Sequence, residues 1–108
     1  MTDSVSETIR SLVLLTAHTT IVHHIPGRIR IRVLPSGVAI ARRIDFDKVR
    51  AHLTGILGVR VNPVVGSVVI EYDSNRLSPK LWEDLAGNEA TPERISSLET
   101  TLSALWTE

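Results

Sequence analysis

Apolar and positively charged residues alternate along one short stretch of the chain, and this alternation predicts a β-strand. Ile and Val occupy every second position of residues 28–33, and arginines occupy the positions between them. Successive side chains of a strand point to opposite faces, so the apolar residues share one face and the arginines share the other. Pro26 and Gly27 precede the strand in the order that a type II turn requires. Residues 20–25 are therefore either a separate strand that folds back or the same strand continued through a bulge.

Helical signals cover two segments of the N-terminal half. A first helix is predicted from about Val5 to Ala17, because Ser4 and Glu7 match a capping box near the start of the apolar pattern. A second helix is predicted from about Asp45 to Leu57, and a glycine directly after it is placed to end it.

A β-hairpin is predicted after this second helix. Val59–Asn62 and Ser67–Tyr72 are strand-like, and the four-residue link between them favours an antiparallel pair. By contrast, Leu34–Arg43 is punctuated by proline and glycine and is predicted to be a loop. The hairpin side chains expected to face the core are Val59, Val61, Val68, Ile70 and Tyr72.

Two further helices are predicted towards the C-terminus. The pair Ser78–Pro79 gives an N-cap and a first-turn proline for a short helix that carries Trp82 and is closed by Gly87. The pair Thr91–Pro92 repeats this signal before the last helix. The apolar residues of the last helix are spaced by three and four positions and form a narrow seam: Ile95, Leu98, Leu102 and Leu105.

The order of these elements predicts an α+β protein with a ferredoxin-like α/β sandwich. Helices would cover one face of an antiparallel sheet, with additional helices at the N- and C-termini. The predicted division is a helical extension at residues 1–19, the ferredoxin-fold domain at 20–88 and an amphipathic helix at 89–108. Where a fourth strand should follow the Trp82 helix, the chain supplies the last helix instead. The sheet therefore either has three strands or uses Thr20–His24 at the vacant edge.

Composition narrows the classes of function. The chain has 108 residues, 43% hydrophobic and 22% charged, with a formal net charge of zero. It contains no cysteine, which excludes disulfides, thiolate nucleophiles and Cys-based metal sites. The start has no basic leader, and the apolar run Leu12–Leu15 is too short to span a bilayer. We therefore expect a cytoplasmic protein that does not insert directly into a membrane.

Three stretches of the sequence resemble a known family. They are His23–Arg32, which includes Pro-Gly-Arg-Ile-Arg, then Leu53–Asn62 and Gly66–Asp73. Together they are similar to the bacterial heavy-metal-associated domains with a "PGRIR" first strand, which occur alone or attached to metal-transporting P-type ATPases. The resemblance covers roughly Ile21–Gly87. It implies metal homeostasis, binding and transfer of soft metal ions through a Cys-x-x-Cys loop, and a metal transporter as a possible partner. Here the corresponding loop is Leu34–Arg43, which has no Cys, His, Asp or Glu, so transfer by the family mechanism is not supported.

Histidines are the remaining candidate ligands for a transition metal or haem iron. His18, His23 and His24 are predicted as ligands, whereas His52, on a helix flank, is interpreted as simple surface. Adjacent strand residues point to opposite faces, so His23 and His24 cannot readily chelate one ion within one chain. A homodimer could bring the same histidine from each subunit together. The alternative is that this pair is a partly buried, hydrogen-bonded feature of the strand.

Arg28, Arg30 and Arg32 form a predicted basic ladder that could bind phosphate or carboxylate groups. The simpler interpretation is a solvated sheet face or cross-strand pairing with Glu71. Zero net charge and few aromatic residues argue against nucleic-acid binding.

No arrangement of residues suggests catalysis, because the sequence lacks a Ser-His-acid set, paired carboxylates, a phosphate-binding glycine loop and the acylphosphatase loop. Two non-catalytic functions are therefore predicted. One is handling of a transition metal or haem through histidines. The other is a ligand-free interaction or oligomerisation module associated with a metal transporter or another partner. In either case a homo-oligomer is expected, with an interface on the last helix made by Leu98, Leu102, Leu105 and Trp106.

Overall fold

The structure, a computed structural model, describes residues 2–107, with side chains from Val5 to Thr107. Within this range the chain forms an α+β fold of four strands and five helices. The helices are α1 (Thr2–Ala17), α2 (Val38–Ala41), α3 (Phe46–His52), α4 (Pro79–Leu85) and α5 (Pro92–Leu105), and a 3-10 turn covers Pro35–Gly37. The strands are β1 (Thr19–Ile25), β2 (Arg28–Val33), β3 (Ile56–Asn62) and β4 (Ser67–Tyr72).

The strands form one antiparallel sheet in the order β1-β2-β4-β3. β1 and β2 make a hairpin through Pro26 and Gly27, and the φ angle of +92° at Gly27 is the conformation that the predicted turn needs. Residues 20–25 are therefore a separate strand that folds back and occupies the sheet edge. β2 and β3 are parallel to each other with β4 between them, and α3 lies in the connection from β2 to β3.

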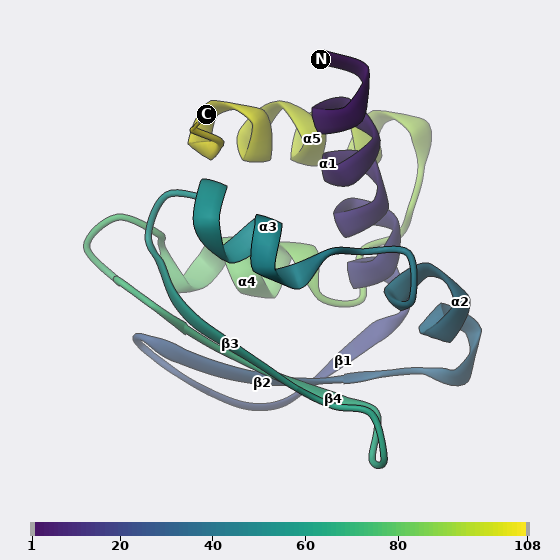
Figure 1. The fold of residues 1–108 in the computed structure, drawn as a ribbon, viewed down its shortest axis with the longest axis vertical. Coiled ribbons are helices and arrows are strands. Elements are labelled where there is room, and N and C mark those ends of the chain that lie inside the picture. Colours follow the sequence, from purple (N-terminus) through teal and green to yellow (C-terminus); the bar gives the residue numbers. More distant parts are fainter. Residues whose placement is uncertain (1, 108) are drawn as a thin grey trace.

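All the longer helices lie on one side of the sheet (Figure 1). α3 and α4 form a layer next to the strands, α5 lies above them, and α1 runs alongside from the level of α5 down to β1. This arrangement confirms the prediction of an antiparallel sheet with helices on one face. The opposite face of the sheet carries no helix from the described part of the chain.

The hydrophobic core lies between the covered sheet face and the helices. α1 contributes Ile9 and Val13, and α5 contributes Leu98 and Leu102, each at most 4% exposed. The core is therefore continuous across the boundaries predicted near residues 19 and 89. Burying one such side chain stabilises the fold by roughly 1.5–3 kcal/mol. The terminal helices are thus part of the same packed unit as the sheet.

The second helix ends earlier than predicted. α3 stops at His52, not Leu57, because Gly55 adopts a φ of +92°, which is incompatible with a continuing helix. A Cβ at this position would lie 2.8 Å from Cγ of Leu77, so the turn also requires the absence of a side chain. Gly55 therefore ends the helix in place of Gly58, the glycine that directly follows the predicted end at Leu57, and β3 begins already at Ile56.

Three smaller expectations also differ from the structure. The predicted loop Leu34–Arg43 contains the 3-10 turn and α2. Val61 is opposite the buried Val68 but is 48% exposed, because it lies near the β3–β4 turn, which projects beyond the helices (Figure 1). α1 begins at Thr2, so Ser4 is not at the helix start, and its side chain lies outside the described part.

Candidate binding site on the open sheet face

The histidines predicted as metal ligands are not brought together. His18 lies at the end of α1, where its Nδ1 is 2.9 Å from Oγ of Ser36. His23 and His24 lie about 16 Å and more along β1 from His18, given a rise of roughly 3.3 Å per strand residue. Within residues 2–107 no group of three His, Cys, Asp or Glu side chains could hold a metal ion. The described residues of one chain therefore offer no metal site of three such ligands.

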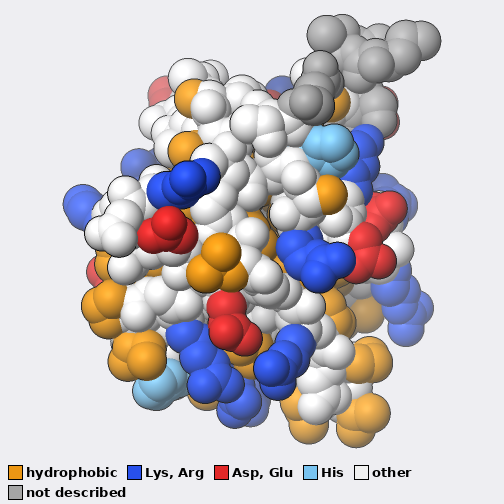
Figure 2. Space-filling model, turned by 60° about the vertical axis from the view of Figure 1, so that its left-hand side comes forward, with side chains coloured by type: hydrophobic (Ala, Val, Ile, Leu, Met, Phe, Trp, Pro, Cys, Tyr) orange, Lys and Arg blue, Asp and Glu red, His pale blue; other side chains and the backbone are white. Residues whose placement is uncertain are grey.

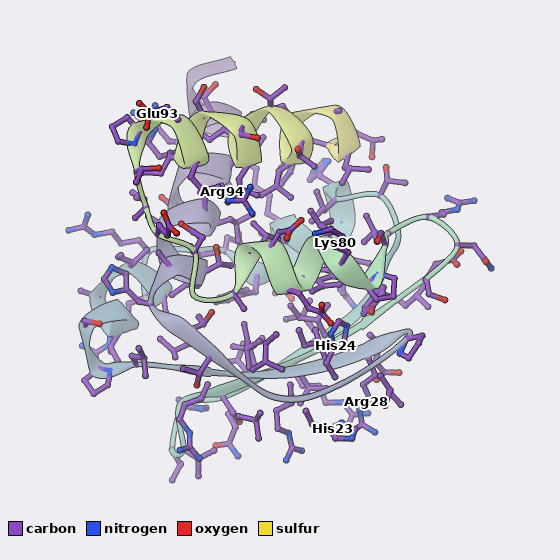
Figure 3. All side chains as sticks on the ribbon, turned by 180° about the vertical axis from the view of Figure 1, so that it is seen from behind. His23, His24, Arg28, Lys80, Glu93 and Arg94 are labelled. Carbon is purple, nitrogen blue, oxygen red and sulfur yellow. The ribbon has the colours of Figure 1, made fainter. Side chains whose placement is uncertain are left out.

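His24 points into the molecule, between the sheet and α4 (Figure 3). Its side chain is 8% exposed, its Nε2 lies 2.7 Å from Oη of Tyr72, and its Nδ1 lies 3.3 Å from Oε2 of Glu83. The carboxylate favours a proton on Nδ1, so Nε2 accepts the hydrogen bond that the Tyr72 hydroxyl donates. The Tyr72 ring in turn packs against Trp82, with ring centroids 5.2 Å apart.

A carboxylate, an imidazole and a hydroxyl in this order can activate a nucleophile in an enzyme. Tyr72, however, is only 2% exposed, so its hydroxyl is not accessible to a substrate. The same contacts link β1, β4 and α4 through His24, Tyr72 and Glu83. His24 therefore matches the alternative stated for the histidine pair, a partly buried, hydrogen-bonded feature of the strand.

His52 is not the simple surface residue that the sequence suggested. Its ring stacks on Trp106 with centroids 5.4 Å apart, and its Nδ1 donates to the carbonyl oxygen of Thr107 at 2.7 Å. The backbone N–H of Thr107 donates back to the carbonyl of His52 at 2.7 Å, and Leu53 forms a β-bridge with Trp106. These contacts fasten the C-terminal segment to the end of α3.

The residues predicted as an oligomer interface are used within the chain. Leu98 and Leu102 are 4% and 2% exposed, and Leu105 and Trp106 are partly buried against the same core. α5 packs on α1, and Arg10 and Glu99 add an exposed ion pair of 3.3 Å between the two helices. Trp106, directly after α5, packs on His52 at the end of α3. The four side chains thus already pack against their own chain. Self-association through this seam stays a prediction.

The arginines of β2 lie on the side of the sheet that carries no helix. Arg28, Arg30 and Arg32 are all exposed, whereas the residues that alternate with them are buried. We call this surface the open sheet face. It is made by His23 of β1, Arg28, Arg30 and Arg32 of β2, Arg60 of β3, and Val69 and Glu71 of β4.

The open sheet face has an excess of positive charge. Its four arginines face a single acid, Glu71, which leaves a net charge of +3 on these residues. Glu71 is the cross-strand partner of Arg28, but its ion pair is with Arg60, at 3.8 Å and between side chains 80% and 49% exposed. Among residues 2–107, Arg28, Arg30 and Arg32 form no ion pair. The three arginines therefore form a solvated sheet face, and Arg28 is the cross-strand partner of Glu71 without an ion pair to it.

The neutral net charge of the chain conceals a separation of charge. Figure 2 shows one group of Lys and Arg side chains at the lower edge of the molecule, the side on which Figure 1 places the sheet, and others spread over its upper part. Acidic residues, by contrast, are frequent around α4 and α5, where Asp84 pairs with Lys80 at 3.2 Å and with Arg94 at 3.6 Å. The other acids of this region are Glu83, Glu89, Glu93 and Glu99. The basic sheet face is thus opposed by a more acidic helical side.

Aromatic side chains are confined to the helical side of the sheet. Tyr72 and Trp82 are buried, and Phe46 and Trp106 are partly buried against the core. These four are the whole aromatic complement of the chain. The open sheet face therefore lacks the stacking platform with which single-stranded nucleic acids are usually bound.

No protein-family model, curated protein or solved structure matches the chain. The resemblance to heavy-metal-associated domains thus depends on the sequence stretches that suggested it. Across residues 2–107, the structure contains no helix with the length and apolar character needed to cross a bilayer.

Proposed function

We propose that this chain is a non-catalytic interaction module that binds an acidic segment of a partner protein on its open sheet face. The observation that carries the proposal is the set of four exposed arginines, opposed by one glutamate, on a sheet face without a helix. Because the chain as a whole is neutral, this concentration of charge is a local feature of one surface. Arginine suits such a surface, since its planar fork of N–H donors matches the two oxygens of a carboxylate.

The spacing of the arginines indicates the shape of the partner. Arg28, Arg30 and Arg32 are two residues apart on one strand, so their positions repeat about every 6.6 Å. An extended segment with Asp or Glu at every second position presents carboxylates at the same repeat. We therefore expect the segment to bind in an extended conformation, with alternate residues facing the arginines.

The order of the strands supports the resemblance to heavy-metal-associated domains. β2, α3 and β3 form a crossover with β4 between the two parallel strands, as in the centre of a ferredoxin-like sheet. β1 occupies the edge where that fold places the strand after its second helix. By the resemblance to heavy-metal-associated domains, the partner would be a metal transporter or a protein that acts with one.

The test is a binding titration with a labelled peptide in which Glu alternates with Thr, and with a control peptide in which Gln replaces Glu. The matched variants are Arg30→Gln on the open sheet face and Arg50→Gln on α3, which lies on the helical side of the sheet. We expect Arg30→Gln to weaken binding of the Glu peptide about threefold to tenfold, because an exposed charge-assisted contact is lost. Binding should also weaken with added salt.

The proposal would be wrong if the Gln peptide bound as tightly as the Glu peptide. It would also be wrong if Arg50→Gln weakened binding as much as Arg30→Gln, since both variants remove one positive charge. In that case net charge, and not the open sheet face, would account for the affinity.

A second candidate function keeps the predicted handling of a transition metal or haem. It is favoured by the position of His23, which is exposed on the edge strand β1 and could meet the same residue of a second copy. The measurements are a Soret band after addition of hemin and elemental analysis of the purified protein. Loss of binding in His23→Ala would support this function, and binding that survives both His23→Ala and His24→Ala would exclude it.

A further inference from the structure

A hollow lies on the open sheet face at the β1–β2 hairpin. It measures about 220 Å³ and is lined by His23, Arg28 and Arg30. His23 and Arg28 lie together below the sheet, whereas His24 lies on the other side, next to α4 (Figure 3). The adjacent histidines therefore belong to different environments, and only His23 contributes to this hollow.

The lining of the hollow offers hydrogen-bond donors from three directions. His23 is the cross-strand partner of Arg30, which places their Cβ atoms about 5 Å apart, and Arg28 follows two residues away on the same face. Each guanidinium carries five N–H donors, and the imidazole adds one or two. Within residues 2–107 none of the three side chains makes a hydrogen bond or an ion pair. Their donors are therefore available to a ligand.

We infer that His23, Arg28 and Arg30 form a binding site for a phosphoryl group, the end of a phosphate monoester. A phosphoryl group has three terminal oxygens in a tetrahedral arrangement, so it can accept from three separate side chains, whereas a carboxylate offers two oxygens in one plane. Its charge of about −1.5 to −2 at neutral pH also matches two arginines better than a single carboxylate does.

The size of the hollow agrees with this ligand. The volume of about 220 Å³ is far above the roughly 10–15 Å³ that one water needs, so the hollow admits a group larger than a water molecule. This is enough for a phosphoryl group together with the atoms that attach it to a larger molecule. Glu71, the acid nearest along the sheet register, does not line the hollow and is paired with Arg60.

The surroundings of the hollow favour a phosphorylated protein side chain over a small phosphate ester. Ile25 of β1 is two residues from His23, is the cross-strand partner of Arg28 and is 49% exposed. This apolar side chain offers a contact to a residue next to a phosphorylated serine or threonine, and a free phosphate would leave it unused. This step rests on the proposed function, because it places the phosphoryl group on the partner segment that the open sheet face would bind.

The experiment compares three peptides of one sequence that carry phosphoserine, glutamate or serine at the central position. We expect the phosphoserine peptide to bind the unmodified protein at least tenfold more tightly than the serine peptide and more tightly than the glutamate peptide. Arg28→Gln, in the hollow, should remove most of this preference. Arg32→Gln is the matched control, because Arg32 lies on the open sheet face but does not line the hollow. Arg32→Gln should weaken the binding of all three peptides to a similar extent.

The outcomes separate the two proposals. Equal binding of the phosphoserine and glutamate peptides overturns the phosphoryl site and leaves the proposed function standing. If inorganic phosphate or free phosphoserine binds as tightly as the phosphopeptide, the ligand is a small ester and the assignment to a protein segment fails. Tighter binding to vesicles that contain a phosphorylated lipid would also overturn that assignment. If free phosphoserine binds but no acidic peptide does, the site stands and the proposed function fails.

Discussion

The two faces of the sheet are made by the same strands, yet they differ in almost every property. On β2, Ile29 is 1% exposed beneath the helices, while its neighbours Arg28 and Arg30 are exposed on the face without a helix. One face therefore supplies the packing that holds the domain together, and the other supplies charge that contributes little to that packing. Alternate residues of a single strand can therefore serve stability and recognition separately. Substitutions on the covered face should lower the stability of the fold, and substitutions on the open sheet face should leave it almost unchanged.

The largest expected effect distinguishes the two faces on β2 itself. Ile29→Ala should lower the free energy of unfolding by about 2–5 kcal/mol, because it removes a buried side chain and leaves a cavity. Arg30→Ala, one residue away, should change the free energy by no more than about 0.5 kcal/mol. Denaturant unfolding followed by circular dichroism measures both. Similar losses for the two variants would mean that the open sheet face is covered in solution.

A smaller effect is expected for the two adjacent histidines. His24→Ala should lower the free energy of unfolding by about 1–3 kcal/mol, because it leaves the buried Tyr72 hydroxyl without its partner. His23→Ala should be close to neutral, since its side chain is exposed and makes no such contact. The same unfolding experiment checks the pair. A neutral His24→Ala would show that the link between β1, β4 and α4 does not stabilise the fold.

The smallest loss of stability is expected at the β1–β2 turn, which fixes the faces on which the residues of β1 and β2 lie. A slip of one residue between β1 and β2 would exchange the faces, so the turn at Gly27 matters for the comparison. Gly27→Ala should cost about 1 kcal/mol, because alanine disfavours a φ of +92°. Gly58→Ala is the control, since its φ is not in the left-handed region and a Cβ there meets nothing within 4 Å. Thermal unfolding that ranks the two variants in the reverse order would contradict this account of the turn.

Local signals in the sequence predicted much of the fold. Alternation identified β2, and the N-caps predicted at Ser78 and Thr91 are formed in the structure. The end of α3 could not be located in this way, because Gly55 and Gly58 are both plausible terminators in sequence. Only the packing of Leu77 against Gly55 distinguishes them.

The site was predicted less completely, because its character depends on contacts between distant residues. Alternation placed the arginines of β2 on one face, but it could not tell that Arg60 would join them and take Glu71 as its partner. Likewise, the apolar seam of α5 was visible, but a periodic pattern does not reveal whether Leu98 packs on its own chain or on a second copy. The stacking of His52 on Trp106 joins residues more than fifty positions apart, and no local pattern predicts it.

The most direct test of the account maps the bound surface by nuclear magnetic resonance during titration with the alternating Glu peptide. The account predicts that the amide signals that shift belong to β2 and β4, around Arg30 and Val69, and that those of α1 and α5 stay in place. Shifts confined to the helices, or no shifts at concentrations where the peptide is bound, would contradict the claim that the open sheet face is the binding surface.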